Sequence, residues 1–285
     1  MQRRQASPGK EPPDFRMTLP RAAHPWRQKR GGNGFRKSIA CLALVLGVLA
    51  AACGSPPVTE TWDYVAMGVF TREAGGISTV PSQYAAHIEK DKGVTVALHN
   101  QERMEPEDIA ENLQTNEELR QLVREAEVIT FDFSLEWINF PEGLFRSGMC
   151  KGADNQDCLR TGVQEAKDDW SAIVSQITEL RAGKPIVIRV LLMGDWWLDW
   201  RFAKGSPEND AVIGEYYREL ESFLEADAAR RGIPVVRAFP EPYFNESPPP
   251  SGYFGGIGGV HYSDEGSAVL AGLLRGLGYE PVVLK

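Results

Sequence analysis

Five short apolar segments recur along the chain with helical patterns between them, and this alternation constrains the fold more than any other feature. The apolar segments cover residues 64–69, 94–98, 127–133, 185–192 and 233–239. Apolar residues at helical spacing predict helices over 82–91, 106–114, 116–126, 164–180, 209–231 and 264–277. Strands that are apolar throughout and alternate with helices form parallel sheets covered on both faces. The sequence therefore predicts an α/β protein, a three-layer α/β/α sandwich with a five-stranded parallel sheet.

The N-terminal segment precedes this pattern and has the composition of a targeting signal. A basic stretch is followed by an apolar run over 39–52, which is shorter than the about 20 residues that a membrane-spanning helix needs. The run ends in small residues before Cys53 and resembles a bacterial lipobox, with Ala50 where that motif usually has Leu. We therefore predict that Cys53 is lipidated, the alternative being an ordinary cleaved signal with an incidental Cys. The leader is unusually long, and Met17 is an alternative start.

Cleavage before Cys53 would leave a short tether and one domain. The predicted parts are a leader and signal peptide over 1–52, a tether over 53–61 and a domain over 62–285. Without the leader, the chain has 21 basic and 37 acidic residues, a net charge of −16. A surface this acidic repels nucleic acid, so no nucleic-acid partner is expected. It also repels anionic headgroups, so membrane attachment would come from the lipid on Cys53. The predicted location is extracytoplasmic, on a bacterial membrane in the cell envelope.

Cys150 and Cys158 are the two cysteines that remain outside the signal segment and the lipobox. They flank a loop rich in Gly, Asp and Asn. An even number of cysteines outside the cytoplasm favours a disulfide that closes this loop. Two cysteines without His neighbours make a poor zinc site, so we expect no metal, and no cofactor is indicated.

Three segments of the chain resemble the sequence blocks of the SGNH/GDSL hydrolases. They are residues 64–68, residues 115–120 with the strand that follows them, and residues 259–266. The resemblance extends over about residues 62–277 and implies a three-layer, flavodoxin-like fold and, in ordinary members, an esterase or lipase activity. In such members a Ser attacks the acyl carbon, a His oriented by an Asp acts as base, and a Gly and an Asn supply oxyanion donors.

At the matching positions this chain lacks most of those groups. Phe70 stands in place of the nucleophilic Ser, and a phenyl ring has no lone pair with which to attack. Glu105 falls near the oxyanion Gly and Glu136 at the oxyanion Asn, so acceptors replace donors. Gly258 replaces the Asp, which leaves only His261. Loss of the nucleophile alone costs on the order of 10⁶ in turnover in a triad enzyme, so we predict a pseudoenzyme.

These positions leave three interpretations open. The first is a lipoprotein that has lost esterase activity and binds a partner or a small-molecule, acyl or carbohydrate ligand. The second is an active hydrolase of acyl or acetyl-sugar esters, in which Glu136 and His261 activate a water molecule. The third is a structural envelope protein in which His261 merely fills a pocket.

A tryptophan cluster follows the fourth predicted strand. Trp196, Trp197 and Trp200 lie within five residues of one another, in a loop that would reach toward the pocket of the family. They are candidates for a platform on which sugars or acyl chains stack. The alternative is that they pack down as a lid or a small core.

Overall fold

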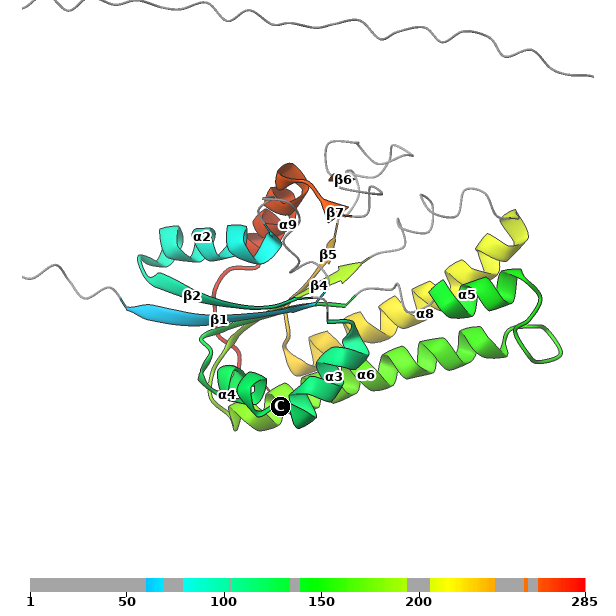
Figure 1. The fold of residues 1–285 in the computed structure, drawn as a ribbon, viewed down its shortest axis with the longest axis horizontal. Helices are drawn as coiled ribbons and strands as arrows, with labels where there is room; N and C mark the ends of the chain where they lie inside the picture. The colour runs from blue at the N-terminus through cyan, green and yellow to red at the C-terminus, as the bar shows by residue number, and fades with distance from the viewer. Residues whose placement is uncertain are drawn as a thin grey trace, which may run out of the picture. The chain divides into compact units, whose positions relative to one another are not determined.

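One parallel sheet organises the chain. The computed structural model describes residues 60–68, 79–102, 104–133, 139–193, 206–238, 254–255 and 261–284, and these belong to one compact unit that begins at Val58. The sheet contains β1 (Thr61–Gly68), β2 (Thr95–Glu102), β3 (Val128–Phe133), β4 (Val187–Met193) and β5 (Val235–Ala238). All neighbouring strands in it are parallel, in the order β2-β1-β3-β4-β5 (Figure 1). The predicted parallel sheet is confirmed, and its order is that of flavodoxin-like folds.

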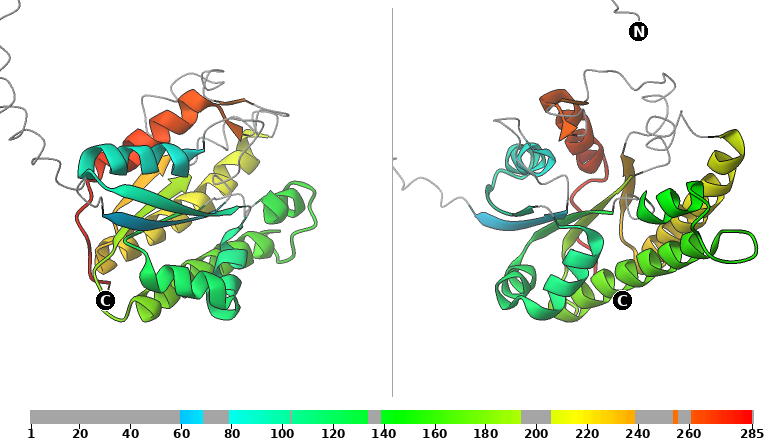
Figure 2. Two further views of the ribbon diagram at one scale, coloured as in Figure 1. Left: turned by 60° about the vertical axis from the view of Figure 1, so that its left-hand side comes forward. Right: turned by 45° about the vertical axis from the view of Figure 1, so that its right-hand side comes forward.

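Helices cover both faces of this sheet, which completes the predicted three layers (Figures 1 and 2). One face carries α2 (Val80–Lys92) and α9 (Asp264–Gly276). The other face carries α3 (Pro106–Thr115), α4 (Glu117–Glu125), α6 (Asp157–Arg181) and α8 (Pro207–Arg231). Alternate residues of β3 enter the two cores: Phe131 packs against Trp170 of α6, whereas Val128 joins the core under α2 and α9. Every side chain of β3 is buried, because both of its faces are covered.

The helix boundaries follow from local capping. Thr79, Ser206 and Ser263 precede α2, α8 and α9, and each side chain accepts the backbone N–H three residues later at 3.1 to 3.3 Å. Gly93 and Gly232 end α2 and α8 in the left-handed conformation, with φ of 69° and 72°. These helices therefore lie where the sequence predicts them to within two residues.

Three elements were not expected from the sequence: α5 (Asn139–Arg146), β6 (Phe254–Gly255) and β7 (His261–Tyr262). Pro141 and Gly143 lie within α5 and disfavour a helix locally. A tertiary contact helps to stabilise it instead: Arg146 pairs at 2.5 Å with Asp210 of α8, and within α5 it also pairs at 2.5 Å with the buried Glu142. The helix α6 also begins earlier than expected, at Asp157.

None of the helices within the described ranges combines the length and the apolar character that crossing a bilayer requires.

Candidate functional site

The strand order predicts a crevice between the carboxyl ends of β1 and β3. From β1 the chain proceeds to β2 on one side, and it then returns to β3 on the other side. In open α/β sheets, ligands bind at such a point, where the connections diverge to opposite sides. The strands on either side end at Gly68 and at Phe133. The candidate site therefore lies at this carboxyl edge, which is where the loops carrying the predicted site residues begin.

Gly68 and Asp132 meet at this edge in unusually close contact. Met67 is paired with Phe131, so Gly68 lies opposite Asp132 on the next rung. A Cβ atom at position 68 would lie 2.0 Å from Oδ2 of Asp132, and the φ of Gly68 is +130°. Both observations require glycine here, since a side chain would overlap the carboxylate and strain the backbone. The carboxyl group of Asp132 therefore covers the backbone at the end of β1.

Asp132 is a site residue that the sequence analysis missed. Its side chain is only 3% exposed, although it carries an ionisable group in a strand of otherwise uncharged residues. That contrast was the available signal, because an Asp within a fully buried strand is rarely there for packing alone. The sequence analysis treated 127–133 as a uniformly apolar strand and therefore did not single out Asp132.

Of the predicted site residues, Glu105 and His261 fall within the described ranges. Glu105 precedes α3, and its backbone N–H donates to the Asp108 carboxylate at 3.0 Å. This contact gives the residue a structural part in starting α3. The backbone of His261 lies in β7, which pairs with β6 and leads directly into α9. Because α9 begins near the carboxyl ends of the strands, the backbone of His261 is at the same end of the sheet (Figure 1).

The other predicted site positions lie outside the described residues. They are Cys53, Phe70, Glu136, Trp196, Trp197, Trp200 and Gly258. Their roles remain predictions from the sequence. Within the described residues, no group of three or more His, Cys, Asp or Glu side chains is arranged to hold a metal ion.

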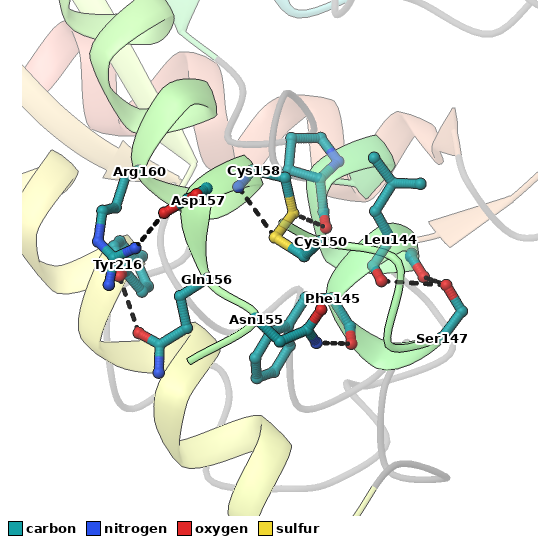
Figure 3. The surroundings of a disulfide bond; sticks show 12 residues. Leu144, Phe145, Ser147, Cys150, Asn155, Gln156, Asp157, Cys158, Arg160 and Tyr216 are labelled. Atoms are coloured by element: carbon teal, nitrogen blue, oxygen red, sulfur yellow. Dashed lines mark hydrogen bonds and ion pairs between the residues drawn. A yellow bond between two sulfur atoms is a disulfide. The ribbon is translucent and has the colours of Figure 1, made fainter. Parts of the chain in front are cut away.

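The predicted disulfide is confirmed. Cys150 and Cys158 are bonded, with their Cα atoms 5.2 Å apart, and they close the loop before α6 (Figure 3). The Tyr216 hydroxyl of α8 donates to the side-chain oxygen of Gln156 at 2.9 Å, which fixes the loop to a second helix. The disulfide thus links Cys158, in the first turn of α6, to the loop that precedes this helix.

A cavity of about 340 Å³ opens beside this disulfide. Its walls include Pro141 and Leu144 of α5 and Glu165 of α6. Met149, at its rim, is 65% exposed. None of the lining residues belongs to β1 or β3, so the cavity is separate from the crevice at the carboxyl edge.

Comparisons with known proteins are informative at the level of structure. No protein-family model matches the sequence, and no curated protein matches it. Among solved structures, a lipase from a goat rumen metagenome is similar over 77% of this chain and 98% of its own, with 16% identity and a TM-score of 0.58.

Two further solved structures are similar to this chain. A gut microbial diltiazem-metabolizing enzyme matches 78% of this chain and 47% of its own, with 14% identity and a TM-score of 0.51. A GDSL-like lipase from Bacteroides thetaiotaomicron matches 82% of this chain and 95% of its own, with 15% identity and a TM-score of 0.40. At such identities, the two matches with a TM-score above 0.5 show a likeness of fold alone.

Proposed function

The described part of the chain has an SGNH/GDSL-hydrolase-like fold, and from this premise we propose that the protein is a lipid-anchored extracytoplasmic member of that fold without esterase activity. In this proposal it binds a small-molecule, acyl or carbohydrate ligand at the carboxyl edge of its sheet. The fold provides the crevice, and the sequence there lacks the groups that ester hydrolysis requires.

The contact between Asp132 and Gly68 is the observation that carries this proposal. In the resembling hydrolases, the nucleophile follows the Gly at the end of the first strand by two residues, a position that holds Phe70 here. The carboxyl group of Asp132 lies against that same Gly. The buried acid therefore lies at the end of the strand from which the nucleophile of the resembling hydrolases is presented, and the nucleophile position itself holds a residue without a lone pair.

The disulfide supports the extracytoplasmic part of the proposal. Disulfides persist in oxidising compartments and are rare in the cytosol. The bond between Cys150 and Cys158 therefore fits a protein that the predicted signal exports. Lipidation at Cys53 rests on the resemblance of the preceding residues to a lipobox.

A fluorophosphonate probe tests the loss of activity. Such a probe forms a covalent adduct with an activated Ser, so we expect intact-mass spectrometry of the folded protein to find no adduct. A catalytically active relative, labelled in parallel, controls for the reactivity of the probe. A stoichiometric adduct on any Ser of this chain would contradict the proposal.

Retained hydrolysis through Glu136 and His261 is the second candidate function. The observation that favours it is the position of β7, which holds the backbone of His261 at the carboxyl end of the sheet. This candidate predicts turnover of short acyl or acetyl-sugar esters that His261→Ala abolishes. Equal background rates in the parent and in the variant would eliminate it.

A further inference from the structure

The cavity beside the disulfide has the size and the lining of a site for a small ligand. Its volume of about 340 Å³ lies within the range of about 300–1,000 Å³ that small-molecule pockets occupy. Gly162 allows α5 to pack closely on α6, since a Cβ atom there would lie 2.9 Å from Cγ of Pro141. The walls are mostly apolar, and they include Pro141, Leu144, Met149 and Cys158. The cavity is therefore built between α5, α6 and the loop that the disulfide closes.

Charged residues also line this cavity, and two of them are unpaired. Asp157 pairs with Arg160 at 2.7 Å (Figure 3). Lys151 and Glu165 have neither a hydrogen-bond nor an ion-pair partner among the residues that the structure describes. The other charged residues between positions 139 and 165 all belong to ion pairs, and they are Glu142, Arg146, Asp154, Asp157 and Arg160. The two unpaired charges of this part of the chain are thus both in the wall of one cavity.

These two charges are separated along α6. The backbone carbonyl of Lys151 accepts from the N–H of Asp157, which places Lys151 beside the first turn of the helix. Glu165 follows Asp157 by eight residues, which is a rise of about 12 Å along a helix. Thr161 lies midway and adds a hydroxyl group to the lining. A ligand that pairs with both charges must therefore carry opposite charges at its two ends and an apolar body between them.

The surroundings determine which end of such a ligand lies where. Burial, and then neighbouring carboxylates that include Glu165, raise the pKa of Glu107 and of Asp169. The nearby Lys167 does not offset these acids, because it pairs with a glutamate of α8. The Glu165 end of the cavity is thus the more negative one and favours a cation, whereas the Lys151 end favours an anion.

We propose that this cavity binds a short apolar peptide with free termini, its ammonium group at Glu165 and its carboxylate at Lys151. Three extended residues span at most about 11 Å, close to the separation of the two charges, whereas a single amino acid carries both charged groups on one carbon. The apolar walls accommodate the side chains, and the Thr161 hydroxyl bonds a peptide amide. Because the cavity is separate from the carboxyl edge, this inference does not rest on the proposed function.

Calorimetric titration with matched peptides tests this site. The probe is leucyl-alanyl-leucine, which is compared at low ionic strength with its N-acetylated form, its C-amidated form and leucine alone. The folded protein is titrated beside Glu165→Gln and Lys151→Met, each of which removes one charge at an exposed position. Glu179→Gln and Lys184→Met are the matched controls, since both positions are exposed and neither lines the cavity.

We expect that blocking either terminus weakens binding to the parent protein by about two- to fivefold, as the loss of a partly exposed ion pair would. Acetylation should have no effect in Glu165→Gln and amidation none in Lys151→Met, whereas the control variants should behave like the parent. Absence of binding, equal sensitivity to the termini in all variants, or binding of leucine as tight as that of the tripeptide would overturn the proposal. None of these results bears on the fluorophosphonate test, so the two proposals fail separately.

Discussion

Two buried aspartates in different regions of the molecule have very different surroundings. Asp227 of α8 is 2% exposed and lies between two helices of the same layer. It accepts from the Trp170 indole N–H at 2.8 Å and from Nε of Arg231 at 2.8 Å, and it also pairs with Arg230. Asp132, 3% exposed, instead lies at the carboxyl edge with its carboxyl group against the backbone of Gly68.

The comparison separates a carboxylate that stabilises the fold from one that shapes a site. Asp227 joins α6 to α8, and its two arginines compensate for the burial of its charge. Asp132 lies in β3 against the backbone of Gly68, at the carboxyl end of the sheet, which is where open α/β folds bind ligands. We therefore expect changes at Asp227 to affect stability chiefly, and changes around Asp132 to report on the geometry of the site.

The largest expected effect is that of Asp227→Ala. The substitution leaves the Trp170 indole and two guanidinium groups without their acceptor, so the free energy of unfolding should fall by about 3–5 kcal/mol. Urea denaturation measures this change. Asp154→Ala is the control, because Asp154 pairs with Arg160 on the surface, where solvent screens the ion pair, and its loss should cost much less. Equal losses of stability for the two variants would show that the buried Asp227 stabilises the fold no more than an exposed carboxylate does.

A smaller effect is expected from Gly68→Ala, which tests the close contact at the site. The added Cβ would overlap the Asp132 carboxylate and hold alanine at a φ of +130°, for a loss of about 2–4 kcal/mol. Gly93→Ala is the matched control: its φ is +69°, and nothing lies within 4 Å of the added Cβ. It should therefore cost only about 1 kcal/mol, through the backbone alone.

A double-mutant cycle separates the two causes at position 68. In an Asp132→Ala background the overlap disappears, so Gly68→Ala should become less costly by about 1 kcal/mol or more. Additive effects in the cycle would show that the carboxylate does not press on the end of β1. Denaturation of the four proteins under one condition provides the measurement.

The smallest expected effect concerns a third, half-buried carboxylate, Asp169 of α6. Burial, followed by the charges of Glu107, Glu165 and Asp168, raises the pKa of Asp169 to about 6. The folded-state pKa thus exceeds the unfolded value of about 3.9, so the folded form binds more protons between these values and loses stability as the pH rises through them. Asp169→Asn should stabilise the protein at pH 8 by about 1 kcal/mol, after allowance for solvent screening.

This advantage of Asp169→Asn should disappear below about pH 4, where the native carboxyl group is neutral as well. Glu179→Gln is the control, since it removes one charge from the same helix at an exposed position and Glu179 is not among the groups that raise the pKa of Asp169. Thermal denaturation of the three proteins across this pH range tests the expectation. A gain that is independent of pH, or that is equal in the control, would contradict it.

Local pattern accounts for most of the architecture. The strand over 127–133 and the helix over 209–231 were predictable because apolar periodicity and capping residues act within a few positions of one another. The helix α5 was not predictable, because Pro141 and Gly143 disfavour it locally and the ion pair of Arg146 with Asp210 depends on a distant helix. The disulfide was predictable from cysteine count and compartment, whereas the start of α6 at Asp157 was not predicted.

By itself, the sequence determined the fold class and the disulfide pair, since these depend on periodicity and residue identity. The replacement of the nucleophile by Phe70 stays a prediction from the sequence. Only the tertiary structure decided the strand order and the contact between Asp132 and Gly68. Register brings these two residues together from 64 positions apart, and no local pattern encodes that pairing. The same parallel register places the start of β1 at the edge of the sheet opposite to the candidate site.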